Sequence, residues 1–226
     1  MKILIHACPQ RMWYVRDFLI PTLQEQDAKN IEVWNDINKQ GNLVACMRSF
    51  ASRKGTGDEG TWHIQDDVLP CRDFVKRCEE YDEGLVYGFC CEQFGDRLDA
   101  AGEVYMADSW HSFQCVRIPD EWARGCAEWV FSKAWQGESS LPELQILFGV
   151  GHGDDTFFRE YTNCRHGYET ALNLKPNLVE HVYWLMGGSS MKRYWDFIAS
   201  AEFFEDLDLV DELKERIKRY NSDDHI

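Results

Sequence analysis

The stretch ILIHACPQR (residues 3–11) decides the fold class. Its first five residues form a near-continuous apolar run, which is typical of a strand buried on both faces of a parallel sheet. The run ends at Cys8-Pro9, and apolar residues at helical spacing follow from Val15 to Leu23. A strand followed directly by a helix is the first unit of an α/β fold, and Pro21 predicts either a kink in that helix or a late start to it.

The same alternation continues along the chain. We expect strands at 31–35, 61–65 and 84–90, separated by helices near 41–53 and 71–81. This βαβαβαβ pattern predicts a mostly parallel central sheet flanked by helices, in one Rossmann-like domain. The remaining pattern predicts a strand at 113–119, helices opening at Asp120 and Asp154, a strand at 177–183 and an amphipathic helix near the end.

Composition narrows the classes of function. The formal net charge of −15 argues against nucleic acid as a partner, since a basic face would be needed to neutralise phosphates. Nine cysteines without a CxxC pair, no leader-like start and no apolar run of transmembrane length predict a reduced, cytoplasmic protein.

Polar residues follow three of the expected strands. They are Cys8 to Arg11, Asn35 with Asp36, and Gln65 to Val68. Ligands of parallel sheets bind at the carboxyl ends of the strands, so these three loops are expected to meet at one crevice.

Asp66 and Asp67 are the most informative pair in these loops. Adjacent carboxylates at a strand end suit Mg²⁺ or Mn²⁺, which complete their shells with water and substrate phosphates. A polar turn before the next helix explains the same pair without a metal. The pair alone does not separate these alternatives.

Two later segments bear on that choice. GVGHGDD (residues 149–155) is a glycine-rich loop in which Asp154 caps the next helix, leaving Asp155 as a candidate general base. His181 stands in an apolar run, either as a core residue or as a metal ligand. The loop after it offers Ser189, Ser190 and Lys192 to a diphosphate.

Four motifs stand in a fixed order between residues 6 and 190: HACPQR, QDDV, GDD and the late PNLVEHV…GGSS. In these motifs the chain resembles the nucleotide-sugar-dependent glycosyltransferases of GT-A fold, family 2-like or related. The resemblance covers roughly residues 2–193. It departs at Gln65, where a strict Asp-x-Asp pattern has an acid, and in the first loop, which lacks the usual Thr-Tyr-Asn.

The resemblance implies transfer of a sugar from a UDP- or GDP-sugar donor to a hydroxyl of a carbohydrate or other acceptor, with Mn²⁺ or Mg²⁺ and with inversion. It implies metal ligation by Asp67 and His181, and a catalytic acid segment of Asp154 and Asp155. The residues that it places at the nucleotide-sugar donor are Ala7, Cys8, Pro9, Arg11, Asp36, Asn42, Asp66, Ser189, Ser190 and Lys192.

The single domain, residues 1–226, is expected to consist of three parts. These are a nucleotide-binding half (1–90), an acceptor-binding and catalytic half (91–200) and a C-terminal amphipathic helix with an acidic tail (201–226). The competing interpretations are a metal-dependent nucleotidyltransferase and a non-catalytic nucleotide-binding protein. The first is disfavoured by the lack of glycines in ACPQRMW (residues 7–13).

Overall fold

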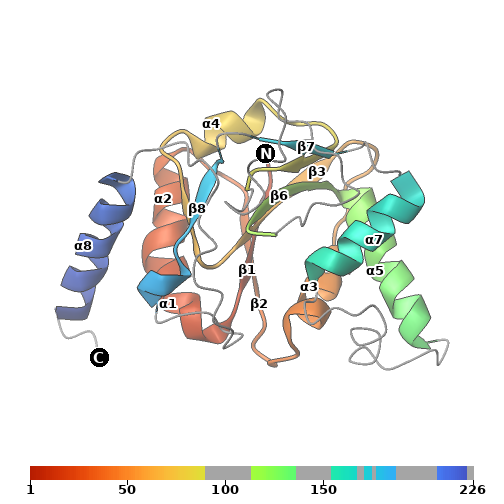
Figure 1. The fold of residues 1–226 in the computed structure, drawn as a ribbon, viewed down its shortest axis with the longest axis horizontal. Helices are drawn as coiled ribbons and strands as arrows, with labels where there is room; N and C mark the ends of the chain where they lie inside the picture. The colour runs from red at the N-terminus through yellow and green to blue at the C-terminus, as the bar shows by residue number, and fades with distance from the viewer. Residues whose placement is uncertain (90–112, 136–153, 167–170, 175–176, 187–207, 223–226) are drawn as a thin grey trace.

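The computed structural model describes residues 1–89, 113–135, 154–166, 171–174, 177–186 and 208–222. Figure 1 shows a central sheet with helices on both faces, which confirms the predicted α/β class. The strands are β1 (Ile3–Ala7), β2 (Ile31–Asn35), β3 (Gly60–Gln65), β4 (Val68–Pro70), β5 (Leu85–Tyr87), β6 (Cys115–Pro119), β7 (Ala171–Asn173) and β8 (Val179–His181).

The helices follow the same chain order. They are η1 (Pro9–Arg11), α1 (Met12–Tyr14), the π-helical turn η2 (Val15–Leu19), α2 (Ile20–Glu25), α3 (Asn42–Ala51), α4 (Phe74–Glu79), α5 (Asp120–Trp135), α7 (Asp154–His166), η4 (Tyr183–Met186) and α8 (Asp208–Ser222). The irregularity expected from Pro21 is present as the π-helical turn that precedes it.

The main sheet has six strands in the order β2-β1-β3-β6-β5-β7. Strands β1, β2 and β3 are parallel, as are β5 and β7, whereas β6 runs antiparallel between β3 and β5. The simple parallel series expected from the sequence is therefore interrupted by one strand. The carboxyl ends of β1, β2, β3, β5 and β7 still lie along one edge.

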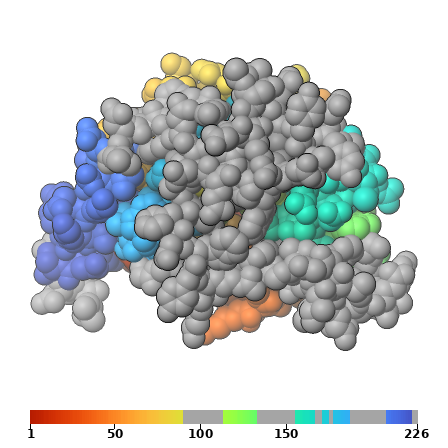
Figure 2. Space-filling model, viewed as in Figure 1, coloured from red at the N-terminus to blue at the C-terminus, as the bar shows by residue number. Residues whose placement is uncertain are grey.

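Two hydrophobic clusters cover the two faces of this sheet. On one face α3, α5 and α7 pack around Phe50, Val116 and Phe158. On the other, the helical segment 12–25, α4 and α8 pack around Trp62, Phe74 and neighbouring apolar residues. Figure 2 shows α8 at one end of the molecule and α7 at the other.

Glycine permits one of these close packings. A Cβ atom at Gly125 of α5 would collide with the Tyr161 hydroxyl of α7, so the side chain of Tyr161 fits there only over glycine.

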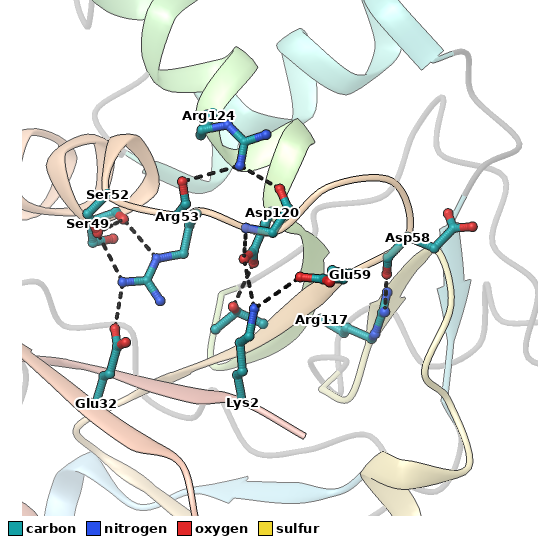
Figure 3. A network of polar contacts seen from close by, with 12 residues as sticks. Lys2, Glu32, Ser49, Ser52, Arg53, Asp58, Glu59, Arg117, Asp120 and Arg124 are labelled. Carbon is teal, nitrogen blue, oxygen red and sulfur yellow. Dashed lines mark hydrogen bonds and ion pairs between the residues drawn. The ribbon is translucent and has the colours of Figure 1, made fainter.

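A polar network joins the amino ends of the parallel strands β1, β2 and β3 to the carboxyl end of β6 (Figure 3). The Asp120 carboxylate, which is 1% exposed, accepts bonds from the Thr61 hydroxyl at 2.7 Å and the Gly55 amide at 2.9 Å. Arg117 and Arg124 donate to backbone carbonyls there. This network is structural, and it lies at the edge opposite to the predicted crevice.

Residues 200–207 of the expected last helix lie outside the described residues. The described part, α8, buries Leu213 and Ile217 one turn apart, as expected for an amphipathic helix. No helix within the described ranges is long and apolar enough to cross a membrane.

Candidate functional site

The loop after β1 is tied directly to the loop after β3. Ile5 and Ile64 are register partners in the parallel pairing, so both chains leave the sheet at the same edge. The Cys8 amide donates to Oδ2 of Asp66 at 2.6 Å, and Pro9 then opens the short helix η1. Two of the three loops expected at the crevice therefore meet.

Arg11 lies between the two aspartates. Its Nη1 is 2.7 Å from Oδ1 of Asp66 and 2.5 Å from Oδ2 of Asp67. All three side chains are less than a tenth exposed. A buried carboxylate is costly unless it is paired, and one guanidinium nitrogen here serves two carboxylates.

The two carboxyl groups differ in their electrostatics. Burial raises the pKa of Asp66, and the neighbouring charge on Asp67 raises it further. Burial acts in the same direction on Asp67, but the charges of His181 and Arg11 and their hydrogen bonds hold the pKa of Asp67 below its usual range. Asp67 is therefore the more firmly ionised member of the pair.

His181 reaches this pair from a distant part of the sequence. It is the register partner of Val68 in the two-stranded sheet of β4 and β8. Its Nε2 lies 3.3 Å from Oδ2 of Asp67, and the Val182 amide donates to the Asp67 carbonyl at 2.8 Å. The structure thus brings Asp67 and His181 together, whereas the small sheet that does so was not expected.

The donor atoms of this group do not fit a divalent cation as they lie. Both oxygens of Asp66 accept hydrogen bonds, from Arg11 and from Cys8, and Oδ2 of Asp67 faces Arg11 and His181. Of the four carboxylate oxygens of Asp66 and Asp67, only Oδ1 of Asp67 is buried without a partner in the described part of the chain. A metal ion needs several such ligands, and no cluster of three candidate ligands occurs among the described residues.

The Cys8 thiol is not activated as a nucleophile. Burial raises its pKa to about 11, and the charge on Asp66 contributes in the same direction. The thiol is therefore protonated at neutral pH, and Cys8 contributes its backbone amide to the site.

The loop after β2 is the third of the predicted loops. The Asp36 amide donates to the Ala7 carbonyl at 3.0 Å, which places this loop beside the end of β1. The Asp36 carboxylate, expected at the nucleotide, accepts the amides of Gln40 and Gly41 at 2.9 and 3.0 Å. Gly41 has a φ of 88°, which glycine adopts at little cost, and Asn42 begins α3 directly after it. Asp36 therefore shapes the loop.

Asp155 lies in the first turn of α7 and is partly exposed. The sequence suggested that Asp154 caps this helix and leaves Asp155 free, but Oδ1 of Asp155 accepts the Thr156 amide at 2.7 Å. Its charge, after burial, contributes to raising the pKa of Tyr87 at the carboxyl end of β5. This electrostatic effect on Tyr87 is the link between Asp155 and the edge of the sheet that holds the other candidates.

Some predicted residues cannot be placed in this site. Ser189, Ser190 and Lys192 lie outside the described residues, and so does the side chain of Asp154, although its backbone begins α7. Their assignments stay predictions.

Of three further polar residues at the carboxyl edge, Asn35 was expected there, whereas Gln114 and Asn173 were missed by sequence reasoning. The side chains of Asn35, Gln114 and Asn173 each have a buried polar atom without a hydrogen-bond partner in the described ranges. Asn35 ends β2, Asn173 ends β7, and Gln114 immediately precedes β6. Their positions beside strand ends were the only signal in the sequence, and the strand at 171–173 was not expected.

Tyr14 was also missed, because it lies in an ordinary helical pattern. Its hydroxyl donates to the Val68 carbonyl at 2.9 Å and fixes the chain just after the aspartates. Burial raises the pKa of Tyr14, and the charge on Asp67 adds to this. The phenol therefore stays protonated as a donor.

No family model and no curated protein matches the chain. Solved structures with some likeness include a protein described as a glucose-1-phosphate thymidylyltransferase from Bacillus anthracis, in complex with sucrose. It is 11% identical, with a TM-score of 0.37 over 77% of this chain and 87% of that one.

Two further structures have similar scores. A fragment of S. aureus TarS, residues 1–349, is 10% identical with a TM-score of 0.44, over 83% of this chain and 62% of that one. An active-site mutant of LgtC is 11% identical with a TM-score of 0.43, over 99% of this chain and 96% of that one. Scores this low carry no weight for the activity.

Proposed function

We propose that this protein transfers a sugar from a nucleoside-diphosphate sugar to an acceptor hydroxyl, and that it binds the donor along the carboxyl edge of the main sheet. The nature of the donor and the inverting course come from the resemblance of the sequence motifs, which is an analogy. The site supports the proposal through its position, because ligands of open α/β sheets bind at this edge.

Buried polar atoms without hydrogen-bond partners support the proposed location of the ligand. Four buried polar atoms without partners in the described ranges follow or precede strands at this edge, on Asn35, Asp67, Gln114 and Asn173. Buried polar groups in native proteins are nearly always hydrogen-bonded, and leaving one unsatisfied costs roughly 1–3 kcal/mol. A polar ligand such as a nucleotide sugar offers the partners that these atoms lack.

Asp155 is proposed as the base that accepts the proton of the acceptor hydroxyl. Its location in the first turn of α7 and its effect on Tyr87 support a place near the same edge. No step of the proposed reaction uses a divalent cation. Both oxygens of Asp66, one oxygen of Asp67 and Nε2 of His181, which could bind a metal ion, already contact Arg11, Cys8 or each other.

The test combines donor binding with a matched control. Gln114→Leu and Asn173→Leu are expected to weaken the thermal stabilisation of the protein by UDP- and GDP-sugars. Asn163→Leu is the control, because Oδ1 of Asn163 is likewise buried without a partner in the described part of the chain but lies in α7. Equal effects from all three variants would show that the edge has no special role in binding.

The role of Asp155 is tested separately. Asp155→Asn should abolish sugar transfer to the acceptor while donor binding is retained, because the amide preserves size and removes the base. Loss of donor affinity in Asp155→Asn equal to that in Asn173→Leu would contradict the base assignment. If no nucleotide sugar binds the wild-type protein, the proposed function is wrong.

A further inference from the structure

The buried aspartate pair already has its cation. Asp66 and Asp67 place two carboxylates next to each other, each side chain 6% exposed. Two like charges in a low-dielectric setting repel strongly, and this repulsion is relieved either by protonation of one group or by a positive charge between them. Nη1 of Arg11 lies 2.7 Å from one oxygen of Asp66 and 2.5 Å from one oxygen of Asp67, and so bridges the two carboxylates.

Arg11 is held in this position by the fold. It ends the helix η1, which Pro9 opens directly after β1, and the Cys8 amide anchors the same turn to Oδ2 of Asp66. The guanidinium is therefore delivered by the sheet register and by a short rigid turn. A long exposed side chain would have to be ordered to reach the same position.

The remaining coordination sites are also engaged. Nε2 of His181 faces Oδ2 of Asp67 at 3.3 Å, so the nitrogen that would bind a metal is directed at a carboxylate. Oδ1 of Asp67 is the one oxygen of the pair left over in the described structure. A single available oxygen beside a guanidinium is a poor site for a divalent cation.

We propose that Arg11 is a built-in counter-ion that takes the place of a divalent metal, so that the aspartate pair binds no Mn²⁺ or Mg²⁺ and the site works without one. Removing the guanidinium is then expected to release the oxygens of Asp66 and Asp67 and the His181 nitrogen, and so to create a metal site. This inference concerns the occupancy of the pair and does not depend on the proposed sugar transfer.

The test is a titration with Mn²⁺ followed by electron paramagnetic resonance of the free ion. Arg11→Met, which keeps the length and apolar stem of the side chain, is expected to bind Mn²⁺ at least ~10-fold more tightly than the wild-type protein. Arg11→Lys retains the charge and should behave as the wild type. Adding Asp67→Asn to Arg11→Met should remove the gain, which separates this site from weak binding at acidic surface residues.

Each outcome of the Mn²⁺ titration supports or overturns the proposed role of Arg11. Tight Mn²⁺ binding by the wild-type protein that Asp67→Asn removes would overturn the inference, and so would a folded Arg11→Met variant that gains no affinity for Mn²⁺. If Arg11→Met is unfolded by circular dichroism, Mn²⁺ is expected to refold it. Failure of Mn²⁺ to do so would also count against a cation site at this position.

Nucleotide binding provides an independent measurement. Stabilisation of the wild-type protein by UDP or GDP is expected to be equal in EDTA and in Mn²⁺. A requirement for Mn²⁺ would overturn the inference. Absence of stabilisation by any nucleotide would count against the proposed function, and the Mn²⁺ titration would still decide the role of Arg11.

Discussion

Removing Arg11 should destabilise the fold far more than removing an exposed arginine. Its side chain is 9% exposed and contacts two carboxylates that are each 6% exposed. Removing one partner of a buried ion pair leaves an uncompensated buried charge and costs about 3–5 kcal/mol. We therefore expect Arg11→Met to lose about that much free energy of unfolding at neutral pH in the absence of metal.

Arg16 provides the matched control. It also pairs with an aspartate, Asp17, at 2.7 Å, but its side chain is 69% exposed. Exposed ion pairs contribute about 0–1 kcal/mol, so Arg16→Met should differ little from the wild type.

The assay is urea denaturation followed by circular dichroism, with m values compared to verify that both variants unfold in the same way. A double variant, Arg11→Met with Asp66→Asn, tests the cause of this loss of free energy of unfolding. Asp66→Asn removes one of the two carboxylate charges left unpaired by Arg11→Met, so the double variant should recover part of the lost stability. If Arg11→Met and Arg16→Met lose equal free energy, the argument that Arg11 compensates a buried charge is wrong.

Three further changes should have measurable effects. Burial lowers the pKa of His6 to about 4, and burial together with the neighbouring histidine lowers the pKa of His63, whose Nδ1 lies 2.9 Å from Nε2 of His6. The unfolded chain then binds more protons than the folded one below pH ~6.5, so stability should fall as the pH drops from there to ~4, by on the order of 2–3 kcal/mol from His6 alone and further from His63. Replacing both with glutamine should flatten that part of the curve. Asp120→Ala should lower the free energy of unfolding, measured by urea denaturation, by about 2–4 kcal/mol, because the buried Gly55 amide and the Thr61 hydroxyl lose their acceptor. A loss below ~1 kcal/mol would show that the network is dispensable. Ile217→Ala should cost about 2–4 kcal/mol if α8 is an integral part of the core, whereas an unchanged melting temperature would show that α8 packs only loosely.

Much of the fold followed from local patterns. The apolar run 3–7 and the alternation after it predicted β1, β2, β3, β5 and the helices between them, because strands buried on both faces need continuous apolar residues. The segments 68–70 and 171–173 were missed, since three-residue strands carry too little pattern to stand out.

Strand order was beyond the reach of these patterns. The strand at 113–119 was expected, but its insertion antiparallel between β3 and β5 depends on pairing between residues far apart in the chain. The sequence CVRIP of β6 does not indicate which strands will pair with it.

The sequence by itself determined that this is an α/β protein and that Cys8, Asp36 and Asp67 follow strands at one edge, because periodicity and parallel connections fix where strand ends lie. Only the tertiary structure decided what the charges do. Arg11 is 56 residues from Asp67, yet their side chains meet in the interior, where pairing is obligatory. Sequence patterns report which groups reach an edge, whereas the partner of a buried charge is set by three-dimensional packing and by the cost of leaving that charge alone.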